Sequence, residues 1–118
     1  MGTFKVPIEI GNPDGTRWQA LEALVDTGST LTSIPRSLWD SLGLTTEFRE
    51  PFVLADGRQA DYDVASALIR LDGRERKTYI LGAEEGSAPL LGAYTLEVFF
   101  LAPDPAHQRL IRVRGWRA

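Results

Sequence analysis

The segment Ala23-Leu24-Val25-Asp26-Thr27-Gly28-Ser29-Thr30 decides the fold, because an apolar run ends there in an acid, a hydroxyl and a glycine. Apolar neighbours on the strand side favour a low-dielectric setting for the Asp26 carboxyl. Gly28 permits a backbone reversal, and the hydroxyls of Thr27 and Ser29 can orient the hydrogen bonds of the carboxylate. An Asp-Thr-Gly turn is common in surface loops, so the flanking residues must decide what this one means.

The residues before this segment predict a β-hairpin. Apolar side chains alternate with other residues from Phe4 to Ile10 and again from Leu21 to Val25, which is the period of half-buried strands. Asn12-Pro13-Asp14-Gly15 lies between them and is a strong turn signal. Pro7 has no N–H, so we expect the first strand to lie at a sheet edge or an interface.

The residues after the segment predict more short strands and one or two short helices. Residues 35–43 suit a helix, because Leu38 and Leu42 are four residues apart and a glycine follows them. Residues 96–101 fit either a helix or a strand. Tight hairpin turns are expected at Asp56-Gly57 and Asp72-Gly73. Strands are expected around Leu31–Ile34, Phe52–Leu54, Val64–Leu71, Tyr79–Leu81 and Leu110–Val113. This pattern is typical of an all-β chain.

Length and composition indicate one globular domain over residues 1–118. Hydrophobic residues make up 43% and charged residues 25%, which excludes a disordered chain. Enzymes with two large lobes are excluded by size, so an active site that needs two domains must recruit a second chain. The net charge of −3 lacks the basic surface of a nucleic-acid binder, so no nucleic-acid partner is expected.

The absence of cysteine excludes disulfides, thiolate zinc sites and cysteine nucleophiles. No apolar run approaches the ~18 residues of a membrane span, so we expect no membrane insertion and a cytoplasmic location. His107 is the single histidine and lies in a turn-like loop, which favours neither a Ser-His-Asp triad nor a metal site. Glu84-Glu85 is interpreted as a solvated loop, and Asp61 and Asp63 as an exposed face.

A second glycine-ended apolar run, Ala88-Pro89-Leu90-Leu91-Gly92, suits packing behind the Asp26 turn. In order, the hairpin, Leu24–Ser29, Phe52–Gly57 and Leu90-Leu91-Gly92 resemble the retropepsin-like aspartic proteases, and most nearly their bacterial single-domain branch. The resemblance extends from about Phe4 to Val113. It implies a closed or partly open β-barrel with one or two short helices, and an aspartic endopeptidase that needs no metal or other cofactor.

The resemblance also implies roles for individual residues. Asp26 is the catalytic aspartate, Thr27 links two such turns across a dimer axis, and Gly28 lies close to bound peptide. Ser29 contacts the outer oxygen of the catalytic carboxyl. Residues 52–62 correspond to a flap that closes over substrate. The substrate-binding set is completed by Leu54, Ala55, Asp56, Gly57 and Arg58, and the structural support of the turn by Leu90, Leu91 and Gly92.

Peptide hydrolysis without a metal requires one group to take a proton from water and another to give one to the carbonyl. Two neighbouring carboxylates can do this because they share one proton. The chain has one Asp-Thr-Gly segment and no internal repeat. We therefore expect a homodimer, with Asp26 contributed by each chain and a peptide or protein as substrate.

The chain departs from the viral pattern at two places. Ala93 stands where viral members carry an arginine, and Thr30-Leu31 stands where they carry an acid that pairs with it. Both partners are absent together, so no buried charge is left unpaired. Dimer stability is then expected to rest on the terminal strands near Phe4–Ile8 and Leu110–Val113.

Two other interpretations remain open. The first is a dimeric retropepsin-like module that has lost turnover and binds peptides or only dimerises; the intact Asp26-Thr27-Gly28 argues against it. The second reads residues 26–30 as the phosphate-binding hairpin of an actin-like kinase, and the short chain argues against that fold.

Overall fold

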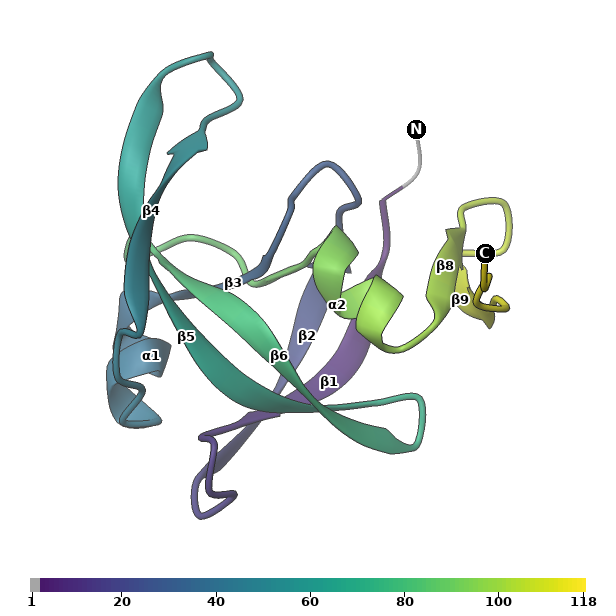
Figure 1. The fold of residues 1–118 in the computed structure, drawn as a ribbon, viewed down its shortest axis with the longest axis horizontal. Helices are drawn as coiled ribbons and strands as arrows, with labels where there is room; N and C mark the ends of the chain where they lie inside the picture. The colour runs from purple at the N-terminus through teal and green to yellow at the C-terminus, as the bar shows by residue number, and fades with distance from the viewer. Residues whose placement is uncertain (1–2) are drawn as a thin grey trace.

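The computed structural model describes residues 3–118, which form nine strands and two short helices (Figure 1). Each helix spans only six residues, so the predicted all-β class with short helices is confirmed. Within this range no helix is long and apolar enough to cross a membrane. The elements are β1 (Lys5–Gly11), β2 (Trp18–Val25), β3 (Thr32–Pro35), α1 (Arg36–Ser41), β4 (Phe48–Val53), β5 (Gln59–Leu71), β6 (Arg74–Ala83), β7 (Leu90–Leu91), α2 (Ala93–Val98), β8 (Leu101–Asp104) and β9 (Arg109–Arg112).

Seven strands form one sheet in the order β1-β2-β7-β3-β6-β5-β4. An additional antiparallel pairing of β1 with β5, from Glu9–Arg70 to Gly11–Leu68, joins the sheet to itself. Six strands therefore form a ring, consistent with the predicted barrel, and β4 extends from the outer side of β5. Pro7 lies in the part of β1 that pairs with β2 alone, as its missing N–H predicts.

The core consists of aliphatic side chains from the strands of this ring, together with the aromatic side chains of Trp39 in α1, Phe99 after α2 and Phe4 before β1. The indole of Trp39 is 1% exposed and packs so closely on β6 that a Cβ at Gly82 would lie 2.9 Å from its ring. The predicted helix at residues 35–43 is confirmed with shorter ends: Pro35 precedes it, and Gly43 follows with φ +68°. The largest fully buried aliphatic residues are Ile10, Ile34, Ile69, Ile80 and Leu91.

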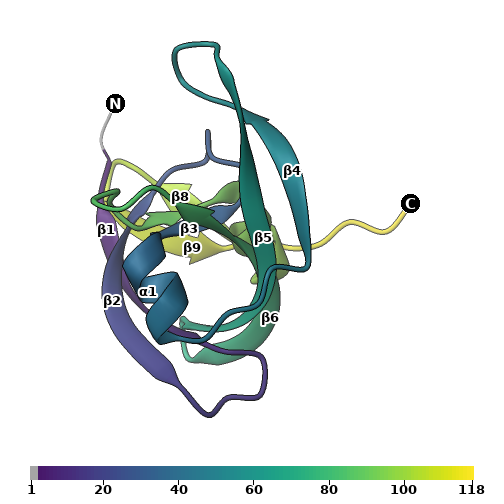
Figure 2. The ribbon, with the colours of Figure 1, turned by 90° about the vertical axis from the view of Figure 1, so that its left-hand side faces the viewer.

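The two predicted hairpin turns differ. Asp72 and Gly73 both have positive φ, which is the tight turn that their sequence predicts. At Asp56-Gly57 the loop is longer, because β4 ends at Val53 and β5 begins at Gln59. β4 and β5 are also longer than the sequence predicted. Together they form a hairpin that projects beyond the rest of the sheet (Figures 1 and 2).

The C-terminal region forms a separate two-stranded sheet from β8 and β9. The ambiguous residues 96–101 are divided between elements: α2 ends at Val98, Phe100 has φ +55°, and Leu101 begins β8. The predicted terminal strand at Leu110–Val113 is β9, one residue earlier, and its partner β8 was not predicted. Ile111 and Val113 are 40% and 43% exposed, so this region leaves apolar surface open to solvent.

Candidate active site

The Asp26 turn connects β2 to β3, and its own backbone fixes the carboxyl group. The Gly28 N–H donates a hydrogen bond to Asp26 Oδ1 at 2.9 Å, and the Ser29 N–H donates to the Asp26 carbonyl oxygen at 3.1 Å. A Cβ at Gly28 would lie 3.2 Å from the same Oδ1. Glycine at this position therefore allows the N–H to reach the carboxylate without crowding it.

The second apolar run lies directly behind this turn. Leu90 and Leu91 form β7, which pairs in parallel with the end of β2 and in antiparallel with Ser33 of β3. The Asp26 N–H donates to the Leu91 carbonyl oxygen at 3.0 Å. A Cβ at Gly92 would lie 2.4 Å from the carbonyl carbon of Leu31, so only glycine fits between the two segments.

Three buried threonines join β3, β6 and α2 beneath the turn. The Gly92 N–H donates to Thr32 Oγ1 at 3.1 Å, so the Thr32 hydroxyl proton is free to bond Thr95 Oγ1, 2.7 Å away. Thr95 Oγ1 lies 3.3 Å from Thr78 Oγ1. All three side chains are at most 3% exposed. Each hydroxyl is satisfied by another protein group, as burial requires.

The start of α2 is bonded to the Asp26 turn. The Ala93 N–H donates to the Ser29 carbonyl oxygen at 2.8 Å, and the Tyr94 N–H donates to the Thr30 carbonyl oxygen at 2.9 Å. The first N–H groups of a helix have no hydrogen-bond acceptors inside the helix, and here two carbonyl oxygens of the turn accept from them. The turn and the helix therefore fix each other.

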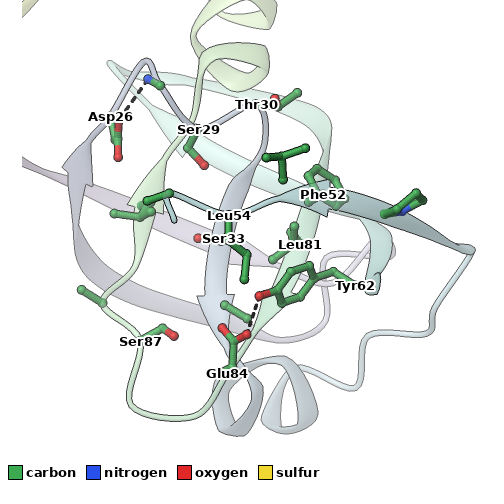
Figure 3. Close-up of a pocket in the computed structure, with 17 residues that line it drawn as sticks. Asp26, Ser29, Thr30, Ser33, Phe52, Leu54, Tyr62, Leu81, Glu84 and Ser87 are labelled. Atoms are coloured by element: carbon green, nitrogen blue, oxygen red, sulfur yellow. Dashed lines mark hydrogen bonds between the residues drawn. The ribbon is translucent and has the colours of Figure 1, made fainter. Parts of the chain in front are cut away.

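A groove of about 790 Å³ opens between the Asp26 turn and the β4–β5 hairpin (Figure 3). Six of the residues predicted for the site line it: Asp26, Gly28, Ser29, Leu54, Ala55 and Leu90. The others lie outside it. Thr27 is exposed on the turn, Leu91 and Gly92 are buried behind it, and Asp56, Gly57 and Arg58 form the tip of the hairpin.

The hairpin tip is held by its own side chains. The Asp56 carboxylate accepts hydrogen bonds from the Arg58 N–H at 3.0 Å and from Arg58 Nε at 2.7 Å. The hydrogen bond from the Arg58 N–H is the main cause of the lowered pKa of Asp56. The Leu54 N–H donates to the Arg58 carbonyl oxygen at 2.7 Å, and Gly57 has φ +88°. These bonds explain why the loop spans residues 54–58.

The far side of the groove is lined by Phe52, Tyr62 and Glu84 among others (Figure 3). Phe52 and Tyr62 lie within the predicted flap range of residues 52–62 but are not among the predicted substrate-binding residues, and Glu84 was missed. The rings of Phe52 and Tyr62 pack edge to face with centroids 6.1 Å apart. The Tyr62 hydroxyl donates a short hydrogen bond to Glu84 Oε2, which raises the pKa of Tyr62 and lowers the pKa of Glu84. The period-two spacing of Phe52 with Leu54, and of Ala60 with Tyr62, was the signal that could have placed these side chains on one face.

The interpretation of Asp63 as an exposed residue is wrong. Its side chain is 12% exposed and accepts hydrogen bonds from Arg36 Nη1 at 2.6 Å and Arg49 Nη1 at 3.1 Å. The bond from Arg36 is the main cause of the lowered pKa of the Asp63 carboxyl. These two arginines come from α1 and β4, which are distant in sequence from Asp63, so the sequence pattern did not indicate them.

Comparisons with known proteins agree with this geometry. A family model described as aspartyl protease matches residues 6–94, and the chain belongs to that family. The matched residues extend from β1 to the start of α2 and include the Asp26 turn and β7. A comparison with curated proteins gave no match. Within residues 3–118, no group of three or more His, Asp or Glu side chains is arranged to hold a metal ion.

Three solved structures share the fold. The protease-like domain of Ddi1 from Leishmania major has 17% identity and a TM-score of 0.61, and the match covers 95% of this chain and 89% of that one. An inhibitor complex of EIAV protease has 20% identity and a TM-score of 0.56, over 80% and 86% of the two chains. Simian foamy virus (mac) protease has 18% identity and a TM-score of 0.55, over 83% and 99%. The predicted retropepsin-like fold is confirmed.

Proposed function

We propose that the protein is an aspartic endopeptidase that hydrolyses peptide bonds with two Asp26 carboxyls, one from each chain of a homodimer. The observation that carries the proposal is the Asp26 carboxyl itself, which is held by the Gly28 N–H at the edge of a large groove in a member of the aspartyl protease family. The chain supplies one such turn, so the second carboxyl comes from a second copy.

In this mechanism the two Asp26 carboxyls share one proton, because two neighbouring carboxylates cannot both ionise. The ionised Asp26 takes a proton from water, and the water oxygen attacks the carbonyl carbon of the peptide. The protonated Asp26 gives its proton to the carbonyl oxygen. The resulting diol collapses when the protonated Asp26 gives its proton to the amide nitrogen and the ionised Asp26 takes the proton of one diol hydroxyl. The C–N bond breaks, the amine leaves, the carboxylic acid forms, and the pair again holds one proton.

The other residues of the turn have supporting roles in this proposal. Thr27 is exposed at the turn, where its hydroxyl can bond to the second copy across the two-fold axis. The backbone of Gly28 lies against the peptide. Ser29 does not take the role that the resemblance implies, because its hydroxyl donates to the Leu31 carbonyl oxygen at 3.0 Å and not to the Asp26 carboxyl. Leu90, Leu91 and Gly92 support the turn from behind.

The β4–β5 hairpin is the flap in this proposal. Leu54 and Ala55 line the groove from this hairpin. The Leu54 N–H already donates to the Arg58 carbonyl oxygen, so an extended peptide bonds to the backbone of Ala55 in this proposal. Asp56, Gly57 and Arg58 form its tip and meet the substrate only when the flap closes. The exposed apolar side chains of Ile111 and Val113, together with β1, are the proposed dimer contact.

Digestion of a peptide library tests the activity, with Asp26→Asn as the inactive variant and Asp40→Asn as the matched control. Asp40 is a remote carboxylate with a 68% exposed side chain, so its variant should cleave as the parent does. An Asp26→Asn variant that still cleaves would exclude the mechanism. If neither the parent protein nor the two variants cleave any peptide, and the parent protein forms a stable dimer, the inactive peptide-binding module is favoured.

A mixing experiment tests the shared pair directly. A tenfold excess of Asp26→Asn should lower the activity of the parent protein to roughly a tenth once the chains have exchanged, because most parent chains then pair with an inactive one. Unchanged activity after verified exchange would show that one chain is sufficient. A monomer at high concentration would contradict the shared site equally.

A further inference from the structure

The side of the groove across from Asp26 carries a charged group that the proposed chemistry does not use. Glu84 follows β6 and lines the groove together with Leu81 and Tyr62 (Figure 3). The Tyr62 hydroxyl bonds to Glu84 Oε2 and fixes the direction of the carboxylate. Tyr62 in turn packs against Phe52, so an aromatic pair from the flap hairpin supports the acid.

The cations near Glu84 are already paired with other acids. Arg36 and Arg49 line a smaller adjoining hollow with Glu84, but both donate to Asp63, at 2.6 and 3.1 Å. Arg58 pairs with Asp56 at 2.7 Å. Among residues 3–118, no arginine, lysine or histidine forms an ion pair with Glu84 within 4 Å. The charge of Arg58 is only the smallest of the effects that lower the pKa of Glu84, and no cation in the described part of the chain contacts the carboxylate directly. A cationic ligand in the groove can therefore pair with it.

The next residue offers an internal contrast. Glu85 has the same charge but does not line the groove. Its Oε1 accepts a hydrogen bond from the Ser37 N–H at 3.0 Å, in the first turn of α1. Two adjacent acids therefore have different roles, because one faces the groove and the other caps a helix.

We propose that Glu84 selects substrates that carry a lysine or arginine side chain at one position of the bound peptide. The inference rests on the proposed function, because it identifies the groove as the peptide site. In an extended peptide alternate side chains share a face, so Glu84 meets one residue and not its immediate neighbours. The two-fold axis places the Glu84 of the second copy on the other side of the cut bond. The preference for a basic residue is then repeated at an equal distance on both sides of that bond.

The charge preference is measured by binding in an Asp26→Asn background, which separates recognition from turnover. Each probe set consists of three extended peptides that are identical except at one position, which holds Lys, Gln or Glu. The varied position is moved by one residue from each set to the next. At the position that meets Glu84, the Lys peptide should bind roughly fivefold more tightly than the Gln peptide, as expected for one partly exposed ion pair. Adding Glu84→Gln should abolish this ratio, whereas adding Glu85→Gln should preserve it.

Cleavage provides the second measurement. The parent protein should enrich lysine and arginine at one position on each side of the cut bond, and Glu84→Lys should enrich acidic residues there. A Lys-to-Gln ratio near one at every position, a ratio unchanged by Glu84→Gln, or no binding of any peptide would overturn the inference. Absent cleavage with the binding ratio intact would instead overturn the proposed activity and leave the recognition by Glu84 standing.

Discussion

Replacing Thr32 with valine keeps the shape of a fully buried side chain and removes one hydroxyl. That hydroxyl accepts the Gly92 N–H at 3.1 Å and bonds Thr95 Oγ1 at 2.7 Å. The variant leaves the Gly92 N–H without an acceptor in a place that water does not reach. Thr95 keeps only the longer contact of 3.3 Å with Thr78.

The cost of the change is set by the unpaired N–H. A buried donor that loses its partner costs about 1–3 kcal/mol. We expect Thr32→Val to lower the free energy of unfolding by about 2 kcal/mol, which lowers the melting temperature by roughly 8 °C in a domain of this size. Thr32→Ser keeps the hydroxyl and loses one methyl group, so its expected loss is about 1 kcal/mol.

Urea denaturation measures these differences, and a single protein concentration keeps the mass-action contribution of any dimer comparable between the variants. Thr95→Val provides a double-mutant cycle: in the Thr32→Val background it should cost less than it does alone, because the shared hydrogen bond is already lost. If Thr32→Val is as stable as the parent, or more stable than Thr32→Ser, the hydroxyl does not hold β7 in place and the reasoning fails.

Two further predictions concern the same scaffold. Gly92→Ala should lower the free energy of unfolding by about 3 kcal/mol, because its Cβ would lie 2.4 Å from the Leu31 carbonyl carbon; a soluble variant with an unchanged urea midpoint would contradict the contact. Asp63→Asn should cost about 1 kcal/mol at neutral pH, because it removes the negative charge and one of the two oxygens that accept hydrogen bonds from Arg36 and Arg49. The folded-state pKa of Asp63 is lowered, so the stabilisation is present above the unfolded pKa of about 3.9 and is lost as the pH falls through the folded value. The difference in unfolding free energy between Asp63→Asn and the parent should therefore shrink below about pH 4; a constant difference would contradict the ion pair.

Local chemistry made several elements predictable from sequence. The Asn12–Gly15 turn forms because Asn12 Oδ1 accepts the N–H groups of Thr16 and Arg17, and Gly15 adopts φ +73°. Asp72-Gly73 needs positive φ at both residues, which these two residues tolerate well. In both turns the residues that interact in space are also neighbours in the sequence, so the local sequence pattern predicts the turn.

The groove was harder to predict because its parts meet only after folding. Glu84 stands beside Glu85 in a polar loop, and nothing local distinguishes the acid that bonds Tyr62 from the one that caps α1. The β8 strand was missed because Pro103 and Asp104-Pro105 have the composition of a loop, yet Pro103 pairs with Leu110 across a two-stranded edge. The groove was missed because its partners are distant in sequence, whereas β8 was missed because prolines concealed a local hairpin with β9.

The departure from the viral pattern has a structural consequence that bears on mechanism. With Ala93 and Thr30-Leu31 in place of an arginine and an acid, the turn is held to α2 by backbone bonds from the Ala93 and Tyr94 N–H groups, at 2.8 and 2.9 Å. An ion pair at this place would carry a desolvation cost and would weaken when its acid is protonated, whereas backbone hydrogen bonds do not titrate. We expect the geometry of the Asp26 turn to be independent of pH over the range in which the proposed carboxyl pair works. The pH dependence of cleavage should then report protonation of the two Asp26 groups and not the loss of the loop that carries them.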